Sequence, residues 1–201
     1  MGVFDTIRSV LGISAERDAT RAADPDDLFG MSTAYVTMMA DLGYDHAGSA
    51  ALCFSDVDST DFQDALSEVE AILEAGSEET GTIASVRRDS QGYRWVVLED
   101  EDPEDLVTSI HFAADTFVER GYGSRLLAAV FAFERDEDPA YWVYSFRRGS
   151  YYPFAPRSGR ERDSSVEFKL QSVLDGELSV ENDTAYWYPL WPSRSGKRPW
   201  E

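Results

Sequence analysis

The chain has 201 residues, which is enough for one complete hydrophobic core and too few for two large domains. A hydrophobic content of 43%, with 13% aromatic residues, is well above that of disordered chains, so we expect it to fold. The 38 acidic and 18 basic residues give a net charge of -20, which excludes long-range attraction to nucleic acid or anionic lipid.

The acidic residues are spread along the whole chain, and only Lys169 and Lys197 among the cations are lysines. In dilute solution so much like charge repels within the folded state, whereas at molar salt the Debye length falls to about 3 Å. We therefore interpret the composition as an adaptation to a halophilic cell interior. On this interpretation, the acidic composition is informative about the salt concentration around the protein and less informative about its binding partner.

The only cysteine, Cys53, lies in the apolar run 50–54, so neither an intrachain disulfide nor a cysteine zinc site can form. We expect a buried structural thiol in a reducing, cytoplasmic compartment. No apolar run approaches the roughly 20 residues of a membrane-spanning helix, and the first residues lack the features of a secretory signal.

Five apolar residues near the N-terminus recur at helical spacing, namely Val3, Phe4, Ile7, Val10 and Leu11. We expect residues 1–23 to comprise this short amphipathic helix and a charged, alanine-rich connector. A free helix this short is marginal in water, so we expect it to pack on something. It either docks on another molecule or folds back on its own domain. A single domain, residues 24–185, and a tail, residues 186–201, follow.

Further along the chain, apolar periodicity, capping residues and turn residues predict regular elements. In chain order these are a helix from Ser32 to near Gly43, a strand at 50–54, a helix from Thr60 to Gly76, strands at 82–88 and 93–98, a helix from Asp102 to Gly121, strands at 126–134 and 141–147, and a helix from Ser164 to Gly176. The capping boxes are Thr60 with Gln63 and Ser164 with Glu167. Pro103 favours the first turn of the helix that Asp102 caps.

This order of strands and helices predicts an α+β fold, with a mainly antiparallel sheet and helices packed on one of its faces. The strand-helix-strand-strand-helix-strand portion is compatible with a ferredoxin-like βαββαβ unit. The helix residues expected to be buried are Phe62, Leu66, Val69, Ile110, Phe117 and Leu170. The sheet on which they pack is expected to contain Trp95, Val97, Val130 and Trp142.

No catalytic or metal-binding constellation stands out in the sequence. Asp56, Asp58 and Asp61 resemble a cation loop, but an EF-hand requires a glycine where Asp61 stands. His111 precedes Asp115 by one helical turn, which predicts a surface ion pair. Phosphate-binding loops, dinucleotide fingerprints and nucleophile elbows are missing from the sequence. We therefore predict a protein without cofactors that is not an enzyme.

The strongest candidate site is the segment 145–169, SFRRGSYYPFAPRSGRERDSSVEFK, because five arginines gather there in an otherwise acidic chain. Large aromatic area, prolines that stiffen the backbone and arginines are typical of interface anchors. The candidate partner- or ligand-binding residues are Arg147, Arg148, Tyr151, Tyr152, Phe154, Arg157, Arg160 and Arg162. In an alternative interpretation, the aromatic residues belong to the core and the arginines pair with nearby carboxylates.

The tail is rich in tryptophan and proline. Trp187, Trp191 and Trp200 stand among three prolines, so the tail cannot be a regular helix throughout. Its tryptophans either strap the tail across the domain or form a docking surface.

Several motifs of this sequence resemble those of PspA-associated proteins of the PspAB family, which occur in prokaryotes. They are MGVFD at the start, DPDDLF before a helix ending in DLGY, ALCF, GYRWVVLED, RRGSYYPFAPRSGRERD and the late DGEL. The resemblance spans essentially the whole chain, and YYPFAPR is its most specific element. It implies an accessory role beside PspA, a coiled-coil protein that lines the inner membrane surface under envelope stress, and it supplies no catalytic residues.

Two classes of function follow. In the first, the chain is a non-enzymatic adaptor of a PspA-type envelope-stress response that binds a PspA-like coiled coil or another protein of that system. In the second, it is a small-ligand sensor or cryptic enzyme that uses Arg147, Tyr151 and Arg157, within residues 147–162, around an anionic group. A convex surface rimmed by aromatic residues favours the first class, whereas a cleft lined by those side chains favours the second.

Salt should stabilise this protein. Because high ionic strength screens the repulsion among the acidic residues, the melting temperature should rise between low and molar salt. Thermal melts over a series of potassium chloride concentrations measure the change. Equal or greater stability in dilute buffer would contradict the interpretation of the acidity as salt adaptation.

Overall fold

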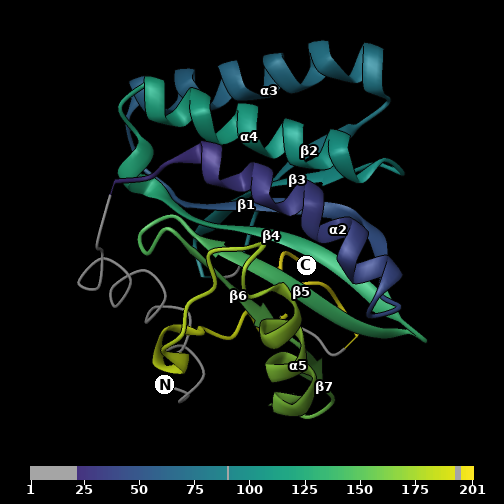
Figure 1. The fold of residues 1–201 in the computed structure, drawn as a ribbon. Coiled ribbons are helices and arrows are strands. Elements are labelled where there is room, and N and C mark those ends of the chain that lie inside the picture. The colour runs from purple at the N-terminus through teal and green to yellow at the C-terminus, as the bar shows by residue number, and fades with distance from the viewer. Residues whose placement is uncertain (1–21, 90, 193–195) are drawn as a thin grey trace.

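The computed structural model describes residues 22–89, 91–192 and 196–201. The amphipathic helix expected within residues 1–23 lies outside this part of the chain. Figure 1 shows one main sheet, a layer of helices over one of its faces and one further helix, α5 (Ser164–Leu174), at its lower side.

The main sheet has six strands in the order β2-β3-β1-β4-β5-β6, and every neighbouring pair is antiparallel. Its strands are β1 (Asp45–Ser55), β2 (Ile83–Arg88), β3 (Tyr93–Glu99), β4 (Leu126–Arg135), β5 (Asp138–Ser145) and β6 (Ser150–Phe154). A separate hairpin pairs β7 (Pro156–Arg157) with β8 (Glu161–Arg162). The helices are α2 (Gly30–Ala40), α3 (Thr60–Thr80), α4 (Pro103–Glu119) and α5 (Ser164–Leu174), with short 3-10 turns η1 (Pro25–Phe29), η2 (Gly123–Arg125) and η3 (Thr184–Tyr186).

The predicted α+β class is confirmed, and so is its ferredoxin-like part. The unit β1-α3-β2-β3-α4-β4 takes the order β2-β3-β1-β4 in the sheet, which is the ferredoxin-like arrangement. Strands β5 and β6 extend this unit beyond β4.

Helices α2, α3 and α4 cover one face of the sheet, as Figure 1 shows. Alternate strand residues such as Leu52, Phe131 and Trp142 point to this face and join the helices in one core cluster. The helix residues that the sequence placed in the core are all buried, namely Phe62, Leu66, Val69, Ile110, Phe117 and Leu170. None of the described helices is both long enough and apolar enough to cross a bilayer.

The opposite face of the sheet is covered by the C-terminal residues. Trp187, Leu190 and Trp200 are buried there, and the ring of Trp200 lies 6.3 Å from that of Trp95. The tail therefore straps across the domain, which was one of its two interpretations, while its boundary at residue 186 stays a prediction.

Coverage of both faces explains the long apolar run of β4, in which residues 126–133 are all buried. The sheet residues that the sequence placed in one core therefore lie on two different faces. Trp142 faces the helices, whereas Trp95, Val97 and Val130 face the C-terminal residues.

Helix α3 differs from its predicted bounds at both ends. Its cap is Ser59 instead of Thr60, because the Ser59 side chain accepts the backbone N–H of Phe62 at 3.2 Å. The helix runs through Gly76 and ends at Gly81, whose left-handed φ of 83° is costly for any residue with a Cβ.

The caps of the next two helices follow the same chemistry. Asp102 caps α4 as predicted, with Pro103 in the first turn. The cap of α5 is Asp163, which accepts the N–H of Val166 at 3.1 Å, and not Ser164.

The sixth strand, β6, was not predicted. The predicted strand 141–147 ends at Ser145, and β6 returns along it as an edge strand. Pro153 is tolerated in β6 because a strand at the edge of a sheet can dispense with one N–H donor. The outer side of β6 is partly satisfied, since Tyr151 exchanges 2.8 Å backbone hydrogen bonds with Ser179 and Glu181.

Candidate functional site

The aromatic residues of the predicted binding segment are buried in β6. Tyr151 faces the helix layer, and its hydroxyl donates to the backbone oxygens of Asp27 and Leu28 at 3.1 and 3.2 Å. Tyr152 and Phe154 point to the other face of the sheet. These positions agree with the alternative interpretation, in which the aromatic residues belong to the core.

Tyr152 and Phe154 support the C-terminal residues. The Tyr152 hydroxyl donates to the backbone oxygen of Tyr188 at 3.0 Å, and the Phe154 ring lies 5.1 Å from that of Trp191. Burial raises the pKa of Tyr152, so its hydroxyl stays protonated and remains a donor.

Arg147 and Arg148 are anchored at the β5–β6 turn. Arg147 donates to the backbone oxygen of Ser124 at 2.6 Å. The Arg148 guanidinium lies 2.8 Å from the Glu181 carboxylate and stacks 3.8 Å over the Tyr186 ring. Both arginines are therefore used to fix the sheet edge to neighbouring segments.

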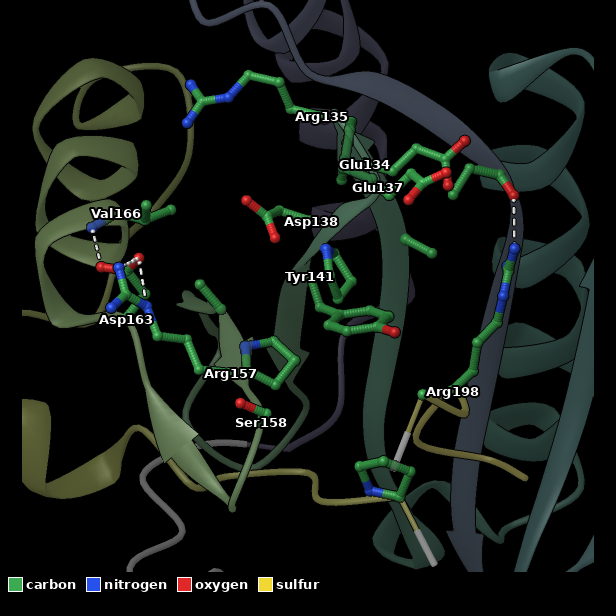
Figure 2. A pocket seen from close by; sticks show the side chains of 18 of the residues that line it. Glu134, Arg135, Glu137, Asp138, Tyr141, Arg157, Ser158, Asp163, Val166 and Arg198 are labelled. Atoms are coloured by element: carbon green, nitrogen blue, oxygen red, sulfur yellow. Dashed lines mark hydrogen bonds and ion pairs between the residues drawn. The ribbon is translucent and has the colours of Figure 1, made fainter. Parts of the chain in front are cut away.

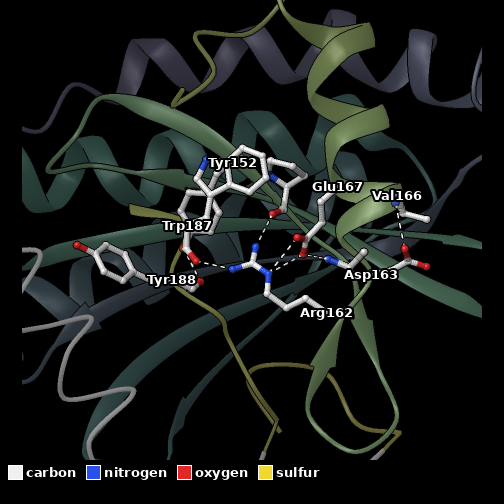
Figure 3. Close-up of polar contacts among 9 residues, drawn as sticks. Tyr152, Arg162, Asp163, Val166, Glu167, Trp187 and Tyr188 are labelled. Carbon is white, nitrogen blue, oxygen red and sulfur yellow. Dashed lines mark hydrogen bonds and ion pairs between the residues drawn. The ribbon is translucent and has the colours of Figure 1, made fainter. Parts of the chain in front are cut away.

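Arg162 lies at the centre of a polar network, which Figure 3 shows. Its Nε atom is 2.8 and 3.0 Å from the two carboxylate oxygens of Glu167. Its Nη atoms donate to the backbone oxygens of Pro153 and Trp187. The same carboxylate accepts the N–H of Ala155 at 2.9 Å. One arginine thus joins β6, α5 and the C-terminal residues.

Glu167, which the sequence predicted as the second member of a capping box with Ser164, is only 2% exposed. Burial raises the pKa of Glu167, and the hydrogen bonds from Ala155 and Arg162 oppose that rise. The Glu167 side chain points into the interior and not to the helix end. The charged carboxylate is tolerated there because it pairs with the Arg162 guanidinium.

The two remaining candidates, Arg157 and Arg160, lie beside a groove of about 1060 Å³. Figure 2 shows the groove between the β7–β8 hairpin, the turn that joins β4 to β5, and residues near the C-terminus. Its charged residues are Arg135, Arg157, Arg160, Lys197 and Arg198, with Glu134, Glu137, Asp138 and Asp163. Tyr44, Tyr141 and Trp191 add aromatic surface. We call this site the charged groove.

Several cations of the charged groove are held in place by other groups. Arg135 lies 4.5 Å over the Tyr44 ring and donates to the backbone oxygen of Leu42 at 3.3 Å. Arg198 donates to the backbone oxygen of Ala47 at 3.0 Å. A guanidinium has five donors, so such contacts orient it without using its full capacity to bind.

Asp163 connects the groove to α5. Burial alone would raise the pKa of Asp163, but the N–H of Val166 and the guanidinium of Arg157 hold it below its usual value. The carboxylate therefore stays ionised and holds the Arg157 guanidinium, although the Arg157 side chain is 63% exposed.

Two turns with left-handed residues border the groove. Among the described residues, the non-glycine residues with positive φ are Asp136, Glu137 and Arg160. Asp136 and Glu137 form the β4–β5 turn, and Arg160 belongs to the β7–β8 turn. Since Arg135 pairs with Asp138, the β4–β5 turn is a two-residue hairpin loop, of the type that requires positive φ at both of its residues.

Other polar residues named from the sequence have structural partners. His111 lies 3.0 Å from Asp26, so the predicted pair with Asp115 is wrong. Asp56, from the supposed cation loop, lies 3.2 Å from Arg94 and 3.5 Å from Arg88.

Cys53 is buried as expected. Within the described part of the chain, no three His, Cys, Asp or Glu side chains are grouped so that they could hold a metal ion.

The sequence missed Arg135, Tyr141, Lys197 and Arg198 as groove residues. They come from β4, β5 and the C-terminal residues, and no local pattern links these segments to the β7–β8 hairpin. The groove includes Arg157 but neither Arg147 nor Tyr151, so the three residues of the ligand-sensor hypothesis do not line one cavity.

The fold and the groove define a small α+β protein with a ferredoxin-like core and an open surface suited to binding. A protein-family model, PspAB (PspA associated protein B), matches residues 1–200, and the chain therefore belongs to the PspAB family. This confirms the resemblance drawn from the sequence. The family is named for an association with PspA and is not a known enzyme family. No curated protein matches the chain significantly.

Glu167→Ala should lower the free energy of unfolding by about 3 kcal/mol, because it leaves the Arg162 guanidinium without its carboxylate in a largely buried site. Glu161 is an exposed residue next to Arg162 in β8. Glu161→Ala should change the free energy of unfolding by less than about 0.5 kcal/mol. Urea unfolding at one fixed salt concentration measures both. Equal effects of the two variants would show that the network does not hold the fold together.

Tyr151→Ala should cost about 3–5 kcal/mol of stability, because it opens a cavity between β6 and the helix layer. Tyr151→Phe should cost only about 1 kcal/mol, the value of its hydroxyl contacts. Arg157→Ala should leave stability nearly unchanged, since exposed ion pairs contribute little. If Tyr151→Ala melted like the wild type, the placement of β6 would be wrong.

Proposed function

We propose that this chain is a non-enzymatic, cytoplasmic accessory protein that binds a PspA-like coiled-coil partner through the charged groove. Membership of the PspAB family supports an accessory role beside PspA. The geometry of the groove supports a role in binding.

The observation that carries the proposal is the local balance of charge. The whole chain has 18 basic and 38 acidic residues, whereas the groove has five basic and four acidic residues. Basic side chains are therefore gathered at this surface against the composition of the protein. A groove with this balance can accept carboxylate side chains, which the rest of the surface repels.

The groove also offers neutral contacts. Burial raises the pKa of Tyr141 to about 12, so its hydroxyl stays protonated and can donate. Trp191 supplies apolar area beside it. We therefore propose that the occupant is a segment of the partner that presents both carboxylate and apolar side chains on one face.

Replacing both exposed arginines of the hairpin tests this role. Arg157→Ala combined with Arg160→Ala should weaken binding to a purified PspA-family protein at least tenfold, because interface arginines often contribute more than about 1 kcal/mol each. Titration calorimetry at fixed high salt measures the affinity, and a thermal melt confirms that the fold is intact.

Arg87→Ala is the matched control. Arg87 is an exposed arginine on β2, at the opposite edge of the sheet from the hairpin, and its replacement should leave the affinity unchanged. An equal loss in both variants would indicate a general effect of net charge. No loss in the double variant would exclude the groove as the binding surface.

A further inference from the structure

Helix α2 has an unusual composition for this protein. Its sequence, GMSTAYVTMMA, contains no charged residue, whereas 28% of all residues in the chain are charged. Met31, Ala34, Tyr35 and Met38 are buried against the sheet. The remaining sides of a helix that covers a core are normally charged or polar.

The outer side of α2 instead exposes apolar side chains. Phe29, Val36 and Met39 are exposed, and their spacing of seven and three residues places them on one side of the helix. Phe112 of α4 is exposed beside Phe29, since the rings of Phe29 and Phe112 lie 4.5 and 5.8 Å from the ring of His111. We call this surface, Phe29, Val36, Met39 and Phe112, the α2 face.

Contiguous exposed apolar surface of this kind marks a binding site. Helix α2 itself contributes no charged side chain to the face. The surface therefore fits an uncharged, apolar helix stripe, which packs on another helix through side chains of this size.

We propose that the α2 face is a docking surface for an amphipathic helix, and that residues 3–11 of the same chain occupy it. Val3, Phe4, Ile7, Val10 and Leu11 recur at helical spacing and form one apolar stripe. Nine helical residues are about 14 Å long, and the eleven residues of α2 are about 16 Å long. The two stripes therefore match in length.

The chain also places this segment within reach. The described residues begin at Ala22, three residues before η1, which leads directly into α2. The ten residues 12–21 span up to about 33 Å when extended, which is twice the length of α2. So short a tether gives the segment an effective concentration in the millimolar range, which compensates for the marginal stability of a short free helix.

Charge is consistent with the same occupant. Between residues 3 and 11 the only charged side chains are Asp5 and Arg8, so the segment carries no net charge. Docking it adds no repulsion to a chain of net charge -20. A strongly acidic segment from elsewhere would be repelled.

Cysteine pairs test the contact directly, because the one native cysteine, Cys53, is buried and will not react. The variant with Ile7→Cys and Val36→Cys, treated with a short flexible bismaleimide linker, should form an intrachain crosslink in most molecules. The control combines Ile7→Cys with Ile83→Cys, because Ile83 on β2 is 63% exposed and Val36 is 65% exposed. The control should crosslink at least tenfold less, as measured by mass spectrometry of the digested monomer.

Equal crosslinking of the two pairs, or crosslinks only between molecules, would overturn the proposal; the second result would assign the face to another copy of the chain. A second measurement does not depend on the register of the two helices. Phe4→Asp should disrupt the apolar stripe and raise amide hydrogen exchange in residues 30–40 several-fold. Unchanged exchange in that helix would equally overturn the proposal.

Discussion

The contact between Arg162 and Glu167 joins the β7–β8 hairpin and the start of α5 to β6 and to the C-terminal residues, which lie elsewhere in the sequence. Removing a carboxylate from water costs several kcal/mol, and attraction to one cation rarely offsets that cost. Here the carboxylate also accepts the N–H of Ala155, and the guanidinium donates to Pro153 and Trp187. Because each guanidinium nitrogen and both carboxylate oxygens of the pair have a partner, the β7–β8 hairpin, the start of α5 and the tail keep fixed positions. The walls of the charged groove are made of these segments.

The C-terminal tail also determines which surfaces of the protein are exposed, because it covers one face of the sheet. An antiparallel sheet often keeps one face in water, but here the helices cover one face and Trp187, Leu190 and Trp200 cover the other. Most residues of β1, β4, β5 and β6 are therefore buried, which leaves the turns, the outer sides of the helices and the edge strand β2 as the exposed surfaces of the described residues. The charged groove lies where the turn between β4 and β5 meets the β7–β8 hairpin, and the α2 face lies on the outer side of a helix.

The fold class could be predicted from sequence because periodicity, caps and turn residues are local signals, whereas the element order was only compatible with the ferredoxin-like strand order that the structure has. Strand β6 was missed because tyrosine, arginine and proline together are typical of both interface anchors and edge strands. The pair of His111 with Asp26 was missed because its members are 85 residues apart, whereas the sequence offered Asp115 one turn away. The groove was missed for the same reason, since no local pattern brings Arg135 and Arg198 together.

The make-up of the groove suits recognition in a salty solvent. At molar ionic strength the Debye length is about 3 Å, so a net charge hardly attracts a partner from a distance, and affinity depends on hydrogen bonds at contact. Arginine serves this purpose better than lysine, because its planar guanidinium binds a carboxylate through two parallel bonds. Four of the five groove cations are arginines, and backbone oxygens orient Arg135 and Arg198. Less side-chain entropy would then be lost on binding, which supports the proposal that the groove of a chain of net charge -20 binds an acidic segment.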